Sequence, residues 1–254
     1  MTRSLESILE IPRDQLLDEF KVVHQRYGNS EQPFAVLELP SVHARFRTTN
    51  RRELKRAVDA ALHVFNSLRK KHLRLYTSVR DTLEMMQVRG IPVVGHTEAI
   101  AVNAINRLNY LKIDHLFNHL YVLEGQVLEH PEPGLGATPN TLPGFVQVLP
   151  RVERKPNPKL LLDICRKEGV LPRDAWYIGD SLSRDIAMAK EAGVNAVWAK
   201  YGTEYDKQLW DILVRVTHWT SEDVKRDEEL RNRAAEVLPD FTVNSFSELL
   251  NLAE

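Results

Sequence analysis

The chain has 254 residues, of which 43% are hydrophobic and 27% charged, proportions that are ordinary for a globular protein. At roughly 150 residues per domain, this length predicts one large domain or two unequal ones. The 34 basic and 35 acidic residues give a formal net charge of -1, which argues against a nucleic-acid partner because nucleic-acid binders usually carry a basic excess.

The amino-terminal part of the chain is expected to be helical. Residues 14–25 place their apolar side chains at helical spacing. Residues 50–72 form a second apolar helical pattern, in which Asn50 is suited to cap the helix and Glu53 follows three residues later, as in a capping box. Between these helices, residues 34–39 are apolar and fit either a strand or a short buried segment.

The pattern changes at about residue 75, where short apolar runs begin to alternate with helical segments, so we divide the chain into residues 1–75 and 76–254. Residues 130–158 hold seven of the thirteen prolines and are expected to form a loop. The alternation predicts an α/β fold with a parallel sheet covered by helices. The expected strands are 91–94, 120–123, 175–178, 195–198 and 241–243. The expected helices are 79–88, 98–111, 158–168, 184–192 and 245–252, and residues 203–237 are expected to be mostly helical.

Two carboxylates follow one of these strands. The apolar run 175–178 leads directly into Gly179 and Asp180, and a helix begins shortly afterwards with Asp185 in its first turn. Gly179 permits a tight turn, which presents Asp180 at the carboxyl end of the strand, where sheets of this type bind ligands. A pair of carboxylates there suits Mg2+. The alternative is that Asp180 caps the helix and Asp185 interacts with its dipole.

Two further candidate residues precede this turn. Lys155 lies just before Pro158, which suits the first turn of a helix, and helix N-termini bind anions. Thr97 follows the apolar run 91–94, so its hydroxyl and the next amides are suited to a phosphate oxygen. The alternatives are a solvated surface lysine and a threonine that caps the helix beginning at Glu98.

Taken in chain order, these residues resemble three motifs of the haloacid dehalogenase (HAD) superfamily. Thr97 after a strand, Lys155 before a helix, and Asp180 with Asp185 after another strand are similar to its motifs II, III and IV. The resemblance covers about residues 75–254. It implies an α/β fold with a Rossmann-like core built on a parallel sheet.

The resemblance also implies roles for these residues. Residues 1–75 would belong to the helical cap that many members insert after motif I. Thr97 would bind the phosphoryl group and Lys155 would neutralise its charge together with that of the nucleophile. Asp180 would bind Mg2+, and Asp185 would support the metal directly or through water.

The sequence departs from the family at motif I, because no Asp-x-Asp occurs in it. In the family, this motif ends the central strand, and its first Asp is the nucleophile that forms an aspartyl-phosphate. The central strand is therefore expected to be absent, which leaves buried backbone groups unpaired. The simplest explanation is a gene product with roughly 30–50 further amino-terminal residues, about one strand–loop–helix unit. The alternative is that residues 34–39 fill the central position without supplying a nucleophile.

The function implied by the resemblance is that of a HAD-like hydrolase, a Mg2+-dependent phosphatase acting on a small phosphorylated metabolite. Because the nucleophile is missing, we expect the chain to be inactive alone. One alternative is a non-catalytic HAD-like scaffold that binds a phosphorylated ligand or a protein. Another is a metal-independent dehalogenase, against which the pair Asp180 and Asp185 argues.

The cellular setting is indicated by cysteine usage and hydropathy. Cys165 is the only cysteine, which excludes disulfides and cysteine-rich zinc sites within one chain and favours a reducing, cytoplasmic setting. No run of 18 apolar residues occurs, so no membrane span is expected. The first residues also lack the apolar core of a signal peptide.

Overall fold

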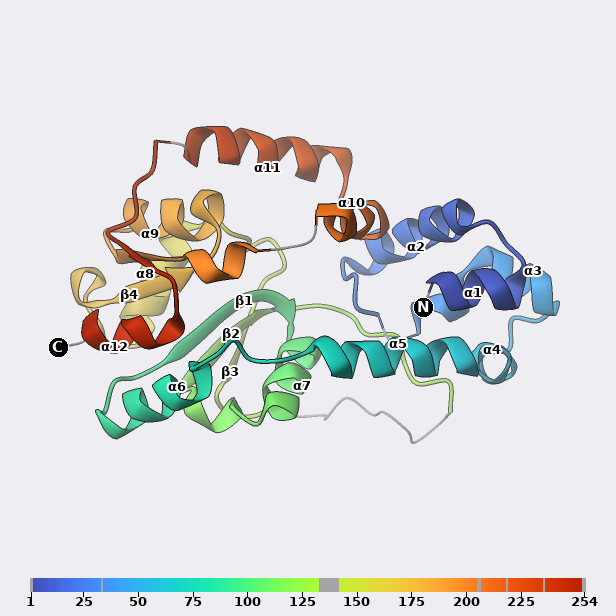
Figure 1. Ribbon diagram of the computed structural model, residues 1–254, viewed down its shortest axis with the longest axis horizontal. Coiled ribbons are helices and arrows are strands. Elements are labelled where there is room, and N and C mark those ends of the chain that lie inside the picture. The colour runs from blue at the N-terminus through green and yellow to red at the C-terminus, as the bar shows by residue number, and fades with distance from the viewer. Residues whose placement is uncertain are drawn as a thin grey trace.

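In the computed structural model, the described residues up to 72 form helices as their regular elements, and the strands begin at residue 94 (Figure 1). The structure describes residues 2–32, 34–132, 142–204, 207–217, 219–234 and 236–252. Figure 1 places the amino-terminal helices at one end of the molecule and the strands toward the other. None of the helices in these ranges is both long and apolar enough to cross a membrane.

The amino-terminal helices share one hydrophobic cluster, which includes Leu16, Phe20, Val36 and Leu54. These helices are α1 (Thr2–Leu9), α2 (Arg13–Tyr27), a 3-10 helix (Ala35–Glu38), α3 (Pro40–Phe46), α4 (Arg51–Ala57) and α5 (Asp59–His72). The expected helix over 14–25 is therefore confirmed as α2. A strand over residues 34–39 was the wrong alternative, because this segment is a buried 3-10 helix and does not complete the sheet.

The predicted cap at Asn50 is confirmed, since its side chain accepts hydrogen bonds from the backbone N–H groups of Arg52 and Glu53. The Glu53 carboxylate instead accepts a hydrogen bond from the Thr48 hydroxyl, so the capping box is incomplete. The single helix expected over residues 50–72 is two helices, α4 and α5, because the backbone departs from helical geometry at Val58.

The first sheet has three parallel strands in the order β1-β2-β3. Its strands are β1 (Val94–Ile100), β2 (His119–Leu123) and β3 (Val146–Leu149), with helices α6 (Val79–Val88) and α7 (Ala101–Leu111) and a 3-10 turn (Asp114–Leu116) alongside them in sequence. Two expectations need correction here. The strand expected at 91–94 begins at Val94 and continues to Ile100, so α7 starts later than expected. The proline-rich stretch expected to be a loop contains β3; its residues 133–141 lie outside the described residues.

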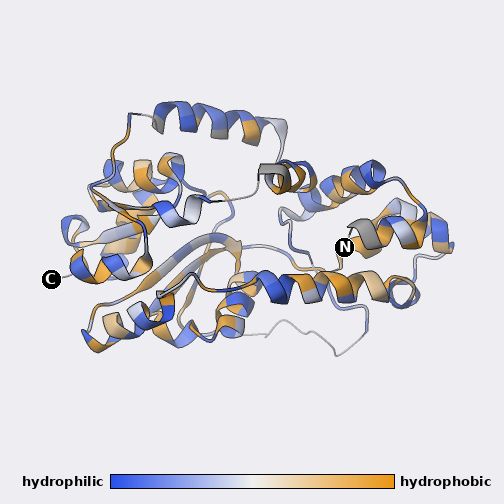
Figure 2. Cartoon of the chain, in the orientation of Figure 1, coloured by the Kyte–Doolittle hydropathy of each residue, from blue (hydrophilic) through white to orange (hydrophobic). Residues whose placement is uncertain are grey.

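The second sheet also has three parallel strands, in the order β4-β5-β6. Its strands are β4 (Trp176–Gly179), β5 (Asn195–Ala199) and β6 (Phe241–Val243). The helices that accompany it are α8 (Pro158–Lys167), α9 (Ala187–Glu191), α10 (Lys207–Val216), α11 (Ser221–Ala234) and α12 (Leu249–Leu252). Short turns lie at Pro172–Asp174, Lys200–Thr203 and Phe246–Glu248, and a π-helical turn at Leu182–Ile186 precedes α9. Helices α10 and α11 are inserted between β5 and β6, and α11 is largely hydrophilic along its length (Figure 2).

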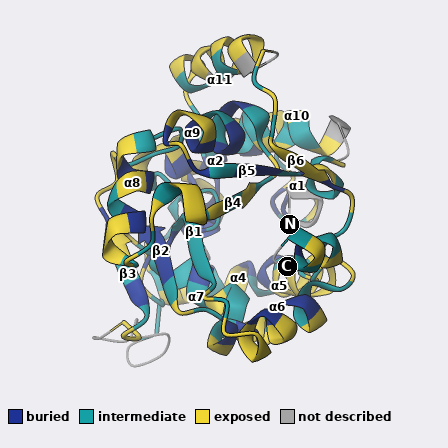
Figure 3. Ribbon diagram, turned by 90° about the vertical axis from the view of Figure 1, so that its left-hand side faces the viewer, coloured by how far each residue is buried: buried dark blue, intermediate teal, exposed yellow. Residues whose placement is uncertain are grey.

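The two sheets do not join through backbone pairing within the described residues, so β1 and β4 are both edge strands. They meet through side chains instead, because the Tyr177 hydroxyl of β4 lies 3.1 Å from Nδ1 of His96 on β1. The middle strands β2 and β5 are mostly buried, whereas Trp176 and Ile178 of β4 are 36% and 37% exposed. Figure 3 also shows that α11 is largely exposed, in contrast to the buried interior. The α/β fold is thus confirmed, with no strand between β1 and β4 in the described chain.

Candidate active site

Lys155 and Asp185 form an ion pair that is largely withdrawn from water. Lys155 Nζ lies 2.9 Å from Oδ1 of Asp185 and donates to the backbone oxygen of His96 at 3.3 Å. The side chains of the pair are only 14% and 8% exposed. Burial by itself would lower the pKa of Lys155, but Tyr177 and Asp185 outweigh it and hold that pKa above its usual range. Lys155 is therefore a fixed cation near the carboxyl ends of β1 and β4, and not a solvated surface lysine.

Asp185 is placed by the tight connection after β4. Ser181 caps the π-helical turn by accepting a hydrogen bond from the Arg184 N–H, and its own N–H donates to Oδ2 of Asp185 at 3.2 Å. A Cβ at Gly179 would lie 2.3 Å from the Cβ of Asp185, so only glycine leaves room for this carboxylate. The interpretation of Asp180 as the helix cap is therefore wrong, because Ser181 has that role.

Asp180 lies at the end of β4 beside Gly202, where a Cβ would come within 2.9 Å of the Asp180 Cβ. Burial and the neighbouring carboxylate of Asp185 raise the pKa of Asp180. Among the described residues, no group of three or more His, Cys, Asp or Glu is placed to hold a metal ion. The two carboxylates nevertheless fit Mg2+, which typically takes one or two carboxylates and completes its shell with water and phosphate oxygens.

Thr97 lies inside β1 and not at its end. Its Oγ1 accepts a hydrogen bond from the Ala99 N–H at 3.1 Å, and the pairing register with β2 breaks between His96 and Ile100. The expected helix cap at Thr97 is wrong, because Ile100 is the residue before α7. Thr97 directly follows His96, whose backbone oxygen contacts Lys155. No described contact joins the Thr97 side chain itself to Lys155, Asp180 or Asp185.

His96 and Tyr177 are two aromatic residues in contact with Lys155. Burial and the charge of Lys155 lower the pKa of His96 to about 3, so the ring is neutral, and its Nδ1 lies 3.1 Å from the Tyr177 hydroxyl. Burial also raises the pKa of Tyr177 to about 12, with Lys155 opposing and Asp185 adding to the shift. The Lys155 ammonium lies 5.4 Å from the centre of the Tyr177 ring. Lys155 is therefore the charged member of this group of three at neutral pH.

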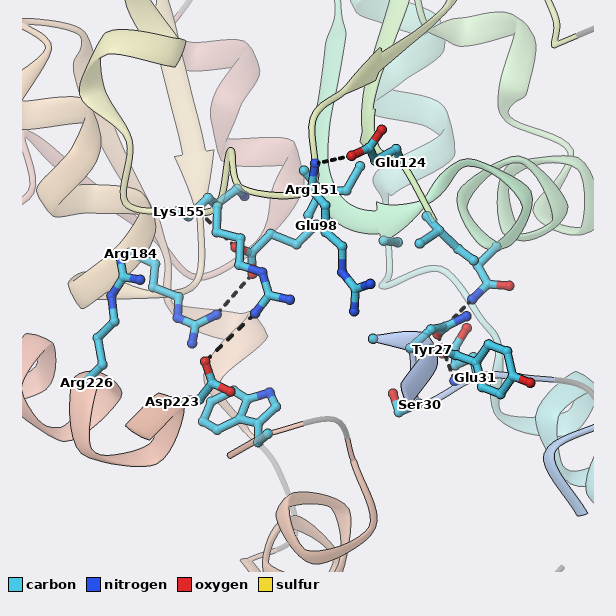
Figure 4. Close-up of a pocket in the computed structure, with 18 of the residues that line it drawn as sticks. Tyr27, Ser30, Glu31, Glu98, Glu124, Arg151, Lys155, Arg184, Asp223 and Arg226 are labelled. Atoms are coloured by element: carbon cyan, nitrogen blue, oxygen red, sulfur yellow. Dashed lines mark hydrogen bonds and ion pairs between the residues drawn. The ribbon is translucent and has the colours of Figure 1, made fainter. Parts of the chain in front are cut away.

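A cavity of about 180 Å³ opens beside Lys155 (Figure 4). It lies between the loop after α2, the carboxyl ends of β1 and β2, and helix α11. Six cationic and four acidic side chains line it, an excess of two positive charges. The cations are Arg107, Arg151, Arg154, Lys155, Arg184 and Arg226, and the acids are Glu31, Glu98, Glu124 and Asp223. Such a lining suits an anionic ligand.

The sequence reasoning missed Glu98 and Arg184 as parts of the site. One Glu98 oxygen accepts the backbone N–H of Lys155 at 2.9 Å, and the other contacts Arg184 at 3.1 Å. Glu98 thus links the end of β1 to both later segments. The sequence signal for Glu98 was its position directly after the candidate Thr97. We overlooked it because Glu98 was expected to be the first residue of a helix.

Comparisons with known proteins agree on one family. Residues 15–193 match the model of the haloacid dehalogenase-like hydrolase family, and residues 152–249 match a second, HAD-hydrolase-like model. The glyceraldehyde 3-phosphate phosphatase of Methanopyrus kandleri is 25% identical over 199 residues, 78% of this chain and 72% of that protein. The phosphoglycolate phosphatase of Mannheimia succiniciproducens is 31% identical over 138 residues, 54% of this chain and 50% of that protein. The chain thus spans about half the length of that phosphoglycolate phosphatase.

Among solved structures, a 2-haloacid dehalogenase from Pseudomonas syringae pv. Tomato DC3000 is similar at a TM-score of 0.48 with 16% identity, over 99% of this chain and 87% of that one.

Proposed function

Because the chain belongs to the haloacid dehalogenase-like hydrolase family, we propose that its site serves the Mg2+-dependent hydrolysis of a small phosphorylated metabolite. The observation that carries the proposal is the buried Lys155–Asp185 pair, which lies beside Asp180 and next to a cation-rich cavity. Relatives named as phosphatases of glyceraldehyde 3-phosphate and phosphoglycolate support this class of substrate.

Each site residue has a chemical role in this proposal. Lys155 offsets the charge of the phosphoryl group, and Asp185 holds the Lys155 ammonium in place. Thr97 and the amides of the β1 bulge donate to phosphoryl oxygens. Asp180 and Asp185 would hold Mg2+, which supplies positive charge to the phosphoryl oxygens when bound. The sequence contains no Asp-x-Asp, so we expect this chain to bind the ester without turning it over.

Calorimetry with 2-phosphoglycolate, with and without Mg2+, tests the site. Charge-assisted hydrogen bonds contribute about 1.5–3 kcal/mol, so Lys155→Met is expected to weaken binding about tenfold or more. Asp180→Asn is expected to remove the effect of Mg2+. Arg173→Met is the control, since its side chain is 81% exposed at the opposite end of β4. Unchanged binding in Lys155→Met contradicts the site, and Mg2+-dependent phosphate release that Asp180→Ala abolishes contradicts the expected inactivity.

The missing Asp-x-Asp also favours a second candidate function, a scaffold that binds a phosphorylated ligand without catalysis. A phosphate-release assay on a product extended by the genomic sequence before Met1, where that sequence encodes an Asp-x-Asp, separates the two candidates. Release of phosphate supports the enzyme, and binding without release supports the scaffold.

The same proposal assigns parts to the two regions of the chain. Residues 1–75 would act as a cap over a core formed by residues 76–254, a division supported by the separate hydrophobic cluster of the amino-terminal helices. We place the protein in the cytoplasm because its single cysteine, Cys165, is free and buried, as expected in a reducing setting.

A further inference from the structure

The loop that follows α2 carries a buried hydrogen-bond donor without a partner. Asn29 is only 7% exposed and lines the cavity beside Lys155. Within the described chain, its Nδ2 makes no hydrogen bond. An unpaired buried amide costs about 1–3 kcal/mol, and native proteins rarely leave one without a reason. An acceptor on a ligand in the cavity would satisfy this donor.

The orientation of the Asn29 amide is fixed by its other end. Its Oδ1 accepts the backbone N–H of Glu31 at 2.9 Å and Nδ2 of Asn103 at 3.3 Å. A backbone N–H only donates, so the oxygen must face Glu31 and the NH2 group must face away from it. Arg107 of α7 also pairs with Glu31. The loop is therefore fastened to α7 at two points, which holds the free donor in a defined place.

A cation without a described ion-pair partner reaches the same loop. Arg151 follows β3, and its side chain extends into the cavity (Figure 4). Its backbone N–H donates to Glu124, but no ion pair of its guanidinium occurs within the described ranges. The guanidinium occupies the space that a Cβ at Gly28 would take. Gly28 has a φ of 62° and ends α2, so glycine both forms the helix end and admits the guanidinium.

The charges around the cavity leave this guanidinium available. Three lining cations pair with lining acids, namely Arg107 with Glu31, Arg154 with Asp223 and Arg184 with Glu98. Lys155 is bound to Asp185 and belongs to the phosphoryl side of the site. The lining charges that remain are Arg151, the exposed Arg226 of α11 and one carboxylate, Glu124, which accepts the backbone N–H of Arg151. A guanidinium and an amide donor together match the two oxygens of a carboxylate.

We propose that Asn29 and Arg151 form a subsite that binds a carboxylate on the leaving group of the phosphate ester. This inference rests on the proposed function, since it assumes that the phosphoryl group lies on the Lys155 side of the same cavity. It assigns the substrate to the short phosphorylated carboxylic acids rather than to phosphorylated aldehydes or sugars. Asn29 and Arg151 are specificity-determining residues in this arrangement.

The test compares two ligands that differ only in the carboxylate. Binding of 2-phosphoglycolate and of ethyl phosphate, which carries a methyl group in place of the carboxylate, is measured by calorimetry on the 254-residue protein in Mg2+. The wild-type protein is expected to prefer 2-phosphoglycolate about tenfold or more, as a charge-assisted pair provides.

Three variants locate the source of that preference. Arg151→Met removes the cation, and Asn29→Asp keeps the acceptor for Glu31 while replacing the free donor with an acidic oxygen. Gly28→Ala displaces the Arg151 guanidinium without changing the charge of the protein. Each is expected to abolish the preference, measured as the ratio of the two affinities in the same variant, and Arg173→Met is expected to retain it. Circular dichroism verifies that each variant is folded, and Arg151→Met keeps the test decisive if the Asn29 variant unfolds.

The outcomes separate this inference from the proposed function. Equal binding of both esters by the wild type, or a preference that survives both Arg151→Met and Asn29→Asp, overturns the subsite and leaves phosphate binding intact. Binding of neither ester overturns the proposed function and the subsite with it.

Discussion

Lys155 shows how a single side chain unites segments that are distant in sequence. Its ammonium contacts Asp185 after β4 and the backbone of β1, while its own N–H is held by Glu98. A buried ion pair seldom adds much stability compared with apolar residues, but a buried charge left alone is costly. The pair therefore matters most when one member is removed.

Lys155→Met is accordingly expected to lower the free energy of unfolding by about 3–5 kcal/mol, because it leaves the Asp185 carboxylate buried without its cation. Urea denaturation followed by circular dichroism measures the change. The exposed Arg166–Asp163 pair, 2.6 Å apart, is the control, and Arg166→Met is expected to cost less than about 1 kcal/mol. Similar small losses in both variants would show that the Lys155 pair is hydrated.

His96 makes the stability of the protein depend on pH. Its pKa is lowered to about 3 in the folded state by burial and by Lys155, below the value of about 6.5 in an unfolded chain. As the pH falls below 6.5, the unfolded state takes up a proton that the folded state does not. Stability is therefore present above pH 6.5 and is lost progressively toward pH 3.

Between pH 6.5 and pH 5, this loss is expected to reach about 1–2 kcal/mol. Urea denaturation at both pH values is expected to show a smaller loss in His96→Asn, which keeps a polar partner for Tyr177. His63→Asn is the control, since that side chain is 77% exposed. A loss of the same size in His96→Asn as in the wild type would mean that other groups account for it.

At the scale of elements, the turn after β4 is determined by one glycine. Gly179→Ala is expected to destabilise the protein by about 1–3 kcal/mol, as overpacking does, because the new methyl group meets the Cβ of Asp185 and not a flexible side-chain end. Gly144→Ala is the matched control, since nothing lies within 4 Å of a Cβ there. Thermal unfolding of the two variants measures the difference, and equal stability would show that the turn adjusts freely.

The elements that sequence patterns predicted well are those with strong local signals. The apolar strand that runs into Gly179 and Asp180 was predicted because a strand, a turn residue and a helix follow one another there. β3 was not, because four residues among many prolines give too short a pattern. The start of α7 was misplaced because Thr97 and Glu98 have the composition of a helix cap, whereas the pairing with β2 breaks after His96 and resumes beyond them at Ile100.

The remaining site residues depend on contacts between distant segments, which no local pattern encodes. Asn29 and Arg151 meet at one cavity although they are far apart in sequence. Asn29 follows an ordinary helix end, and Arg151 stands in a stretch expected to be a loop. Asp180 and Asp185 were found from the strand, turn and helix around them and Lys155 from its place before a helix, whereas only the family motifs connect the three, and their assigned roles stay predictions.

At the scale of the whole molecule, the six described strands form two three-stranded sheets. The edge strand β1 of the first sheet lies toward the edge strand β4 of the second, and no backbone pairing joins the two within the described residues. Exposed backbone groups on an edge open to solvent more easily than those paired on both sides. Amide hydrogen exchange is therefore expected to be at least about tenfold faster in β4 than in the central strand β5. Mass spectrometry of peptic fragments measures this, with β2 against β1 as the internal comparison. Equal protection of β4 and β5 would mean that another strand covers the β4 edge.

Helices α10 and α11, which are inserted between β5 and β6, contact both the amino-terminal helices and the surroundings of the cavity. Arg215 of α10 contacts Asp14 and Asp18 of α2 at 2.6 and 3.2 Å, and His24 hydrogen-bonds the backbone oxygen of Val216. Asp223 of α11 meanwhile reaches Arg154 beside the cavity. A displacement of the amino-terminal helices would thus be transmitted to α10 and, through the chain, to α11. The loop after α2 and helix α11, which both line the cavity, would then move together, so uptake and release of a ligand would depend on the same coupled displacement.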